Sequence, residues 1–269
     1  MDRDEFFDDD YVADQESSFR PHTDITSHEL TSALHSLALL RDDMYLGLQV
    51  TNLAVVDQFI MNLEHHTLQE YFQTDKTPPT TMFLNAQSQM WIFAAYELLR
   101  TWRARAKDII KLANNGGLEL KAASLEEDQG YLHAGREMRA KQLRQIAADP
   151  SIIETIKIDL RRAHIPFSRL EHLRVSFAKH EVRGRNNSIA YAPGYGRINM
   201  MNGSLQYQLE NGPVILDTIS RRDVADELRA LNDQSNIPTV EDLASFDEFM
   251  RASLSKEELE AIRADSSEF

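Results

Sequence analysis

The chain has 269 residues, a formal net charge of -14 at pH 7 and no cysteine. Hydrophobic residues make up 42% and charged residues 27%, and the mean hydropathy is -0.45, which is typical of a folded protein with a sizeable core. The missing cysteines exclude disulfides, thiolate zinc sites, iron–sulfur clusters and cysteine nucleophiles. No apolar run reaches the ~18 residues of a membrane span and the acidic N-terminus is unlike a signal peptide, so we expect a cytoplasmic protein with no membrane contact.

The excess of acid lies at the two ends of the chain. Residues 1–30 hold 10 acids and 2 bases, residues 241–269 hold 9 acids and 3 bases, and residues 31–240 are neutral. Within that neutral part, residues 100–222 carry 21 bases against 13 acids, and the bases are densest at 161–185. This segregation predicts either a local surface that holds a phosphate backbone or helix faces whose arginines are solvated or paired with the acidic ends.

The N-terminal half is predicted to be helical after a short arm. Residues 1–22 are acidic with scattered aromatics, which favours a disordered arm. Helical spacing begins near Ser27, the expected N-cap, and runs to about Leu63 as one helix or as two helices broken near Thr51. Residues 77–81, with two prolines, are predicted to be a loop.

The middle of the chain contains the most regular helical pattern. The apolar stripe predicts a helix over 86–114 that ends at an Asn-Asn-Gly-Gly stop, and a polar helix follows over 125–147. Pro150 fits the first turn of a short helix, and residues 164–166 break the pattern before a helix over 167–182.

Beyond residue 182 the pattern changes to short strands. The Asn202-Gly203 pair between two apolar runs predicts a two-residue hairpin turn, and residues 214–218 are a candidate third strand. Ser220 is the expected N-cap of a further helix, and two short acidic helices are expected at 239–250 and 255–264.

These elements predict a mainly α fold. We expect an up-and-down helical bundle with a small β-hairpin inserted after the helix at 167–182. The expected organisation is an acidic arm at 1–22, a bundle at 23–235 with the hairpin at about 187–218, and acidic C-terminal helices at 236–269.

Common cofactor and metal motifs are absent from the sequence. There is no P-loop, Rossmann glycine pattern, H-E-x-x-H, G-x-S-x-G or EF-hand loop. His164, His172 and His180 recur every eight residues, but Pro166 separates the first from the helix that carries the others. We therefore expect no cofactor and no metal ion.

One pair of residues suggests phosphate chemistry. Arg174 precedes His180 by six residues near the end of a predicted helix, which separates them by about 9 Å along the axis. Brought together from two protomers, they would supply a forked cation for a phosphate and a general base for a ribose 2′-OH. Such a site would favour RNA over DNA.

The Arg-x5-His pattern of Arg174 and His180 resembles the signature of the HEPN (higher eukaryotes and prokaryotes nucleotide-binding) superfamily, with a looser likeness over residues 85–232. The resemblance implies a dimeric α-helical bundle and a metal-independent endoribonuclease of a bacterial defence or toxin-type system, although some members are inert. Active members usually carry a polar residue directly after the arginine, where this chain has Val175.

Weaker assignments surround this pair. Lys179, Arg183 and Arg185 are candidate RNA-binding residues or part of a solvated face, and Glu97 is a candidate to orient Arg174 or to pair on its own helix.

The bland alternative pairs Arg174 with Glu171 and leaves His180 as a cation at a helix C-terminus. It corresponds to a catalytically inactive protein-interaction module whose acidic ends are regulatory or bind a protein partner. A small-molecule-binding regulator is a third possibility, without a recognisable ligand motif.

Overall fold

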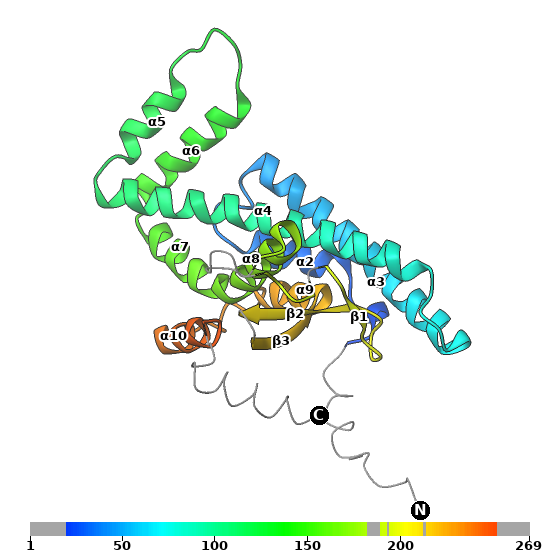
Figure 1. Ribbon diagram of the computed structural model, residues 1–269. Helices are drawn as coiled ribbons and strands as arrows, with labels where there is room; N and C mark the ends of the chain where they lie inside the picture. The colour runs from blue at the N-terminus through cyan, green and yellow to red at the C-terminus, as the bar shows by residue number, and fades with distance from the viewer. Residues whose placement is uncertain (1–19, 182–188, 193, 212–213, 252–269) are drawn as a thin grey trace, which may run out of the picture.

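The computed structural model describes residues 20–181, 189–192, 194–211 and 214–251 (Figure 1). Within these ranges helices dominate and a small antiparallel sheet follows them, which confirms the predicted mainly α fold with a small β insertion. The helical elements are η1 (His22–Asp24), α2 (Ser27–His35), α3 (Met44–Thr74), α4 (Thr80–Asn114), α5 (Leu118–Glu126), α6 (Ala134–Ala148), α7 (Ser151–Arg162), α8 (His164–Lys179), α9 (Arg221–Ala230) and α10 (Val240–Phe249). The strands are β1 (Arg197–Ile198), β2 (Leu205–Asn211) and β3 (Val214–Ser220).

Several predictions concern segments outside the described residues. Residues 1–19 of the arm predicted at 1–22 lie there, and so does the predicted helix at 255–264. Among the described residues, no helix is long and apolar enough to cross a membrane.

The first long helical segment is broken at a different place from the one predicted. Thr26, rather than Ser27, caps α2, and the chain turns between α2 and α3 instead of near Thr51. The turn is held by tertiary contacts, because the Ala38 amide donates to Asp159 (2.8 Å) and its carbonyl accepts from Trp102 (2.7 Å). These contacts come from α4 and α7, so the local pattern alone does not reveal them.

α4 is the central helix of the bundle and packs against α3, α7, α8 and β2. Its two tryptophans are each only 1% exposed, and each indole N–H has a backbone acceptor. Trp91 donates to the Leu53 carbonyl (3.1 Å), and Trp102 donates to the Ala38 carbonyl. These two hydrogen bonds therefore link α3 and the α2–α3 turn to α4.

α5 and α6 form an arm that projects from the C-terminal end of α4 (Figure 1). The sequence pattern predicted one helix over 125–147, but the structure has two helices joined by residues 127–133, where Gly130 has φ +75°. Arg144 of α6 pairs with Glu119 (2.6 Å) and Glu126 (2.5 Å) of α5. These ion pairs and the apolar contacts between α5 and α6 close the arm.

The sheet has the order β1–β2–β3 with antiparallel pairing throughout. Buried side chains alternate along β2 at Leu205, Tyr207 and Leu209, which pack towards α4 and α8. β3 leads directly into α9, whose N-cap Ser220 forms a capping box with Asp223. The predicted Ser220 cap is confirmed.

The predicted two-residue turn at Asn202-Gly203 is wrong. β1 and β2 are joined by six residues, 199–204, and only Gly203 has a positive φ (+78°), whereas a type I′ turn needs two such residues. The side chains of Asn199 and Asn202 accept from the backbone two residues on, at 2.8 and 2.9 Å. A Cβ on Gly203 would lie 2.1 Å from the Glu64 carbonyl oxygen, so the loop is shaped by its contact with α3.

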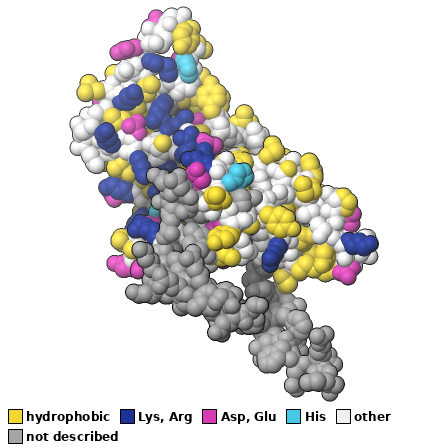
Figure 2. Space-filling view, in the orientation of Figure 1, with side chains coloured by type: hydrophobic (Ala, Val, Ile, Leu, Met, Phe, Trp, Pro, Cys, Tyr) yellow, Lys and Arg dark blue, Asp and Glu magenta, His cyan; other side chains and the backbone are white. Residues whose placement is uncertain are grey.

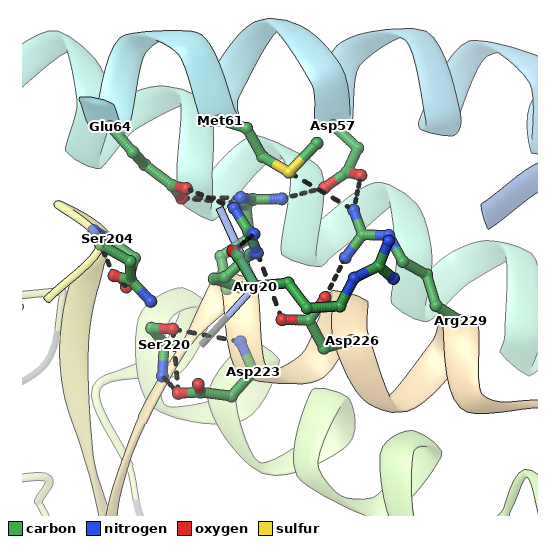
Figure 3. Close-up of polar contacts among 12 residues, drawn as sticks. Arg20, Asp57, Met61, Glu64, Ser204, Ser220, Asp223, Asp226 and Arg229 are labelled. Carbon is green, nitrogen blue, oxygen red and sulfur yellow. Dashed lines mark hydrogen bonds and ion pairs between the residues drawn. The ribbon is translucent and has the colours of Figure 1, made fainter. Parts of the chain in front are cut away.

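Buried charges join α3 to α9 (Figure 3). The side chain of Arg221, the first residue of α9, is fully buried between two fully buried acids of α3. It donates to Asp57 and to Glu64, the latter at 2.7 and 3.1 Å, and its guanidinium lies 5.3 Å from the centre of a Trp91 ring. The arginine and the two acids are thus desolvated together and pair with one another, while Glu64 Oε2 has no hydrogen-bond partner among the described residues.

Two further arginines of α9 extend the buried network. Arg229 donates to Asp57 and to Asp226, and Arg222 lies 3.2 Å from Asp226 and 3.8 Å from Glu64. Burial raises the pKa of Glu64, and Arg221 opposes that rise. Three arginines of α9 therefore meet Asp57 and Glu64 of α3 and Asp226 of their own helix, and the formal charges of the six groups balance.

Removing one acid from this network is expected to destabilise the fold strongly. Asp57→Ala leaves two buried guanidinium groups short of a partner, so the free energy of unfolding should fall by about 3–5 kcal/mol. Urea unfolding followed by circular dichroism measures this change. Glu154→Ala, which removes an exposed i,i+3 ion pair with Lys157, is the control and should cost less than about 1 kcal/mol. Equal losses in the two variants would show that the network is not a critical contact.

Gly203 should tolerate no side chain. Gly203→Ala is expected to lower the free energy of unfolding by about 2–4 kcal/mol, because it combines left-handed backbone strain with a clash against α3. Gly130→Ala is the matched control, since Gly130 has a similar φ and no atom within 4 Å of the added Cβ. Its cost should be limited to about 1–2 kcal/mol of backbone strain. A larger loss at Gly130 than at Gly203 would contradict the steric argument.

Candidate functional site

The predicted site residues lie on α8 and on the turn that follows it. α8 begins at His164, one residue after α7 ends, and its buried face includes Phe167, Leu170 and Leu173. It ends at His180, which adopts the left-handed conformation (φ +54°) and donates its backbone N–H to Ser176 (3.0 Å). The left-handed conformation of His180 ends the helix immediately after the predicted motif.

Arg174 is held against α4. Its guanidinium carbon lies 5.5 Å from the centre of the Tyr96 ring, and the side chain is half-buried. No hydrogen bond or ion pair engages this guanidinium in the part of the chain that the structure describes. Arg174 is therefore a positioned cation whose N–H donors remain open to a ligand.

His180 and Lys179 are exposed beside it at the C-terminal end of α8. The His180 carbonyl accepts from the Ala190 amide (3.0 Å), and Glu181 forms an isolated antiparallel bridge with Ile189. These two contacts bring residues 189–192 back against the end of α8. The predicted RNA-binding residues Arg183 and Arg185 lie between them, outside the described residues.

Arg174 and His180 do not form a joint site within one helix. They are six residues apart on α8, a rise of about 9 Å, and α8 is a regular helix to Lys179. A ligand that contacts both groups closely therefore needs a second chain to supply one of them. The predicted homodimer stays a prediction.

Of the two roles considered for Glu97, the structure shows the ion pair on its own helix. Glu97 lies on α4, next to Tyr96, and its carboxylate pairs with Arg100 on the same helix (2.7 Å), with about half of each side chain exposed. This is the alternative of pairing on its own helix. The structure gives no direct contact between Glu97 and Arg174 among the described residues.

Other cations of the basic segment are neutralised by acids. Arg162 pairs with Asp159 (2.9 Å) with both side chains 3% exposed. Arg169 pairs with Glu227 of α9 and lies 3.7 Å from Asp217 of β3. The local excess of arginine in the sequence therefore overstates the free positive charge on this surface, and Arg174 and Lys179 are the two cations of α8 that carry it.

The loop beside the site is held by residues that the sequence analysis did not single out. The Gly194 carbonyl accepts from both Asn85 and Gln89 of α4 at 3.0 Å, and the Glu210 carboxylate accepts from the Tyr191 and Ala192 amides. The sequence signal for these contacts was the position of Asn85 and Gln89 outside the apolar stripe of α4. These contacts fix the backbone next to His180.

The acidic C-terminal segment packs on the opposite end of α8. The Asp247 carboxylate of α10 accepts a hydrogen bond from Nε2 of His164 (2.8 Å). The Phe246 ring lies 6.3 Å from the His164 ring and 5.9 Å from the Arg169 guanidinium. No residue of α10 is buried, so these contacts at its C-terminal half attach a peripheral helix to α8.

Neither known protein-family models, nor curated proteins, nor solved structures match this chain. The functional argument therefore depends on the geometry of α8 and its neighbours.

The buried carboxyl group of Glu227, between α9 and α8, makes the free energy of unfolding depend on pH. Burial raises the pKa of Glu227 from an ordinary value of 4.5 to about 7, and the neighbouring Arg169 opposes this rise. Because the folded-state pKa lies above the unfolded value, the stability that protonation contributes is complete below about pH 4.5 and is lost as the pH rises through 7.

Glu227→Gln should remove this dependence. Relative to the wild type, the variant's free energy of unfolding should increase by on the order of 2 kcal/mol between pH 4.5 and pH 8. Urea unfolding at a series of pH values measures the difference, with the exposed Glu154→Gln as control. Parallel pH curves for wild type and Glu227→Gln would rule out the raised pKa.

Proposed function

We propose that the protein is RNA-directed, similar to the HEPN superfamily, and that it holds an RNA phosphate at the C-terminal end of α8. The observation that carries this proposal is the state of Arg174: the side chain is positioned over Tyr96 and has no acidic partner in the described chain. Arg169, five residues earlier on α8, and Arg162, at the end of α7, are both paired with acids. An arginine left open among paired arginines is the expected pattern for an anion site.

A phosphate group suits this cation well. A guanidinium presents five N–H donors in a planar fork that matches two phosphate oxygens, and stacking on an aromatic ring fixes its plane. The half-buried position of Arg174 reduces solvent screening of the charge. Exposed Lys179, five residues after Arg174 on α8, adds a second cation.

The stronger form of the proposal is cleavage by two associated chains. His180 of one chain would accept the 2′-OH proton, the 2′-oxygen would attack phosphorus, and the 5′-oxygen would leave and take up a proton. Arg174 would stabilise the negative charge that develops on the phosphorane. The products are a 2′,3′-cyclic phosphate and a 5′-OH end, and the requirement for the 2′-OH restricts the reaction to RNA.

A second candidate function is a catalytically inactive protein-interaction module with acidic regulatory ends. The observation that favours it is the docking of acidic α10 against His164 and Arg169 of α8. In this alternative the C-terminal segment is an exchangeable arm, and α8 is a surface for protein partners.

Substitution of the two α8 residues separates these functions. Arg174→Ala should weaken the binding of a fluorescein-labelled single-stranded RNA by about tenfold and lower the salt dependence of binding by about one counterion. His180→Ala should abolish cleavage of the same RNA in the presence of EDTA while leaving binding within about threefold. Fluorescence anisotropy and denaturing gels measure the two effects.

The control for this experiment is Lys111→Ala, an exposed cation of α4. It should leave both binding and cleavage unchanged, and a DNA of the same sequence should not be cut. RNA binding that is the same in the wild type and Arg174→Ala would exclude the phosphate site. Binding without cleavage in the wild type would reject the nuclease and retain an RNA-binding role.

A further inference from the structure

α3 buries two of its acidic residues among apolar ones on its inner side and leaves its outer side uncharged over most of its length. Between residues 44 and 63 its only Asp, Glu, Lys, Arg or His is Asp57, which is fully buried against α9. Glu64, about two turns after Asp57, is also fully buried. The outward side of the same helix carries no charge over this length and exposes large apolar side chains instead.

α4 continues this surface on the adjacent helix. Residues 77–96 contain no Asp, Glu, Lys, Arg or His at all, in a protein of which 27% is charged. We define the apolar face by six side chains, each between 50% and 63% exposed. They are Tyr45, Leu48, Val55 and Phe59 of α3 and Phe83 and Met90 of α4.

Figure 2 shows the same segregation on one side of the molecule. Hydrophobic side chains gather over the end formed by α3 and the first half of α4, and lysines and arginines gather over the end formed by α5, α6 and α7. A contiguous exposed apolar surface of this kind indicates a binding surface.

The spacing of the exposed side chains fits packing against other helices. On α3, Tyr45, Leu48, Asn52, Val55 and Phe59 follow one another at alternating intervals of three and four residues. This is the spacing of the seam in coiled coils and four-helix bundles, where each side chain enters a hole on the facing helix.

A hollow between the two helices supplies such a hole. It has a volume of about 420 Å³ and is lined by Leu53 and Val56 of α3 and by Met90, Trp91 and Ala94 of α4, with Glu97 at its border. An aromatic or aliphatic side chain from a facing helix fits this volume. Met90 is unbranched and adapts its shape to an incoming side chain.

The size of the surface is sufficient for a stable interface. Six half-exposed side chains of this kind leave on the order of 600 Å² of apolar area open, before the uncharged residues between them are added. A standard interface buries roughly 800 Å² on each partner. Interfaces of permanent homodimers are the more apolar ones, and they are depleted of charge at their centre.

We propose that the apolar face binds a second copy of this chain, with α3 and α4 of both copies forming a two-fold symmetric four-helix bundle. An antiparallel helix pair is self-complementary under a two-fold axis, so it needs no separate partner to cover it. A foreign partner would gain little specificity here, because the six side chains of the apolar face are uncharged and Glu97, beside the hollow, is already paired with Arg100. This inference stands without RNA binding, since Arg174 and His180 contribute nothing to the face.

The first test measures self-association of the full-length chain by analytical ultracentrifugation over a concentration series. The wild type should be a dimer, and Phe59→Lys and Met90→Lys should each weaken dimerisation at least about tenfold by placing a charge in the buried centre. Leu120→Lys is the matched control, because Leu120 is 77% exposed on α5, outside the face, and it should not change the dimer.

Folding is checked by thermal unfolding under the same conditions, so that loss of the dimer is not confused with loss of the fold. A monomeric wild type, or a dimer that survives both substitutions, would overturn the proposal. Persistent dimers with unchanged RNA cleavage in Phe59→Lys would also place the real interface elsewhere.

A second test uses the absence of cysteine from the chain. Asn52→Cys introduces a single thiol on the seam, and an oxidant should convert it to a covalent dimer in high yield at dilute protein concentration. Gln129→Cys, in the loop of the α5–α6 arm, is the control and should not form a covalent cross-link, although it dimerises like the wild type. Equal cross-linking at the two positions would contradict a dimer through α3 and α4, whatever the outcome with RNA.

Discussion

The buried ion network between α3 and α9 is the contact on which the rest of the fold depends. Arg221 is fully enclosed, and its charge is acceptable only because Asp57 and Glu64 are desolvated with it. Such a network does not by itself add much net stability over an apolar core, but each member becomes indispensable to the others. It fixes which side of α3 faces inward, and β3 positions it through the Ser220 cap that starts α9.

The inward orientation of the acids has a consequence for the outer surface. Once Asp57 and Glu64 are committed to the interior, α3 has no other Asp, Glu, Lys or Arg before Glu70 with which to solvate its outer side. Apolar residues such as Leu48 and Phe59 are then exposed next to the uncharged half of α4. The inward acids and the apolar exterior of α3 are therefore two results of one pattern, and the helix pair of the second copy that we propose would cover that exterior.

Tertiary contacts also decide which arginines of the basic segment are paired with acids and which are open. Arg162 and Arg169 serve the structure through Asp159 and Glu227, whereas Arg174 is kept open over Tyr96. The two proposals meet at α4, which carries Tyr96 on the side of α8 and the apolar face on the side of α3. Association through that face and RNA binding at α8 nevertheless use different residues.

The sequence by itself determined the helical class, the helix ends at Asn114 and Ser220 and the strand-rich segment after α8, because apolar periodicity, caps and glycine stops are local properties. The ends of α3 and α8 and the break between α5 and α6 differ from the predictions. It also contained the charge-free stretches of α3 and α4, although that signal was not recognised. Only the tertiary structure decided the α2–α3 turn, the six-residue loop around Gly203 and the state of Arg174. Each of these depends on atoms more than 60 residues away in the chain, such as the Trp102 indole or the Glu64 carbonyl, and no local pattern reports a contact of that kind.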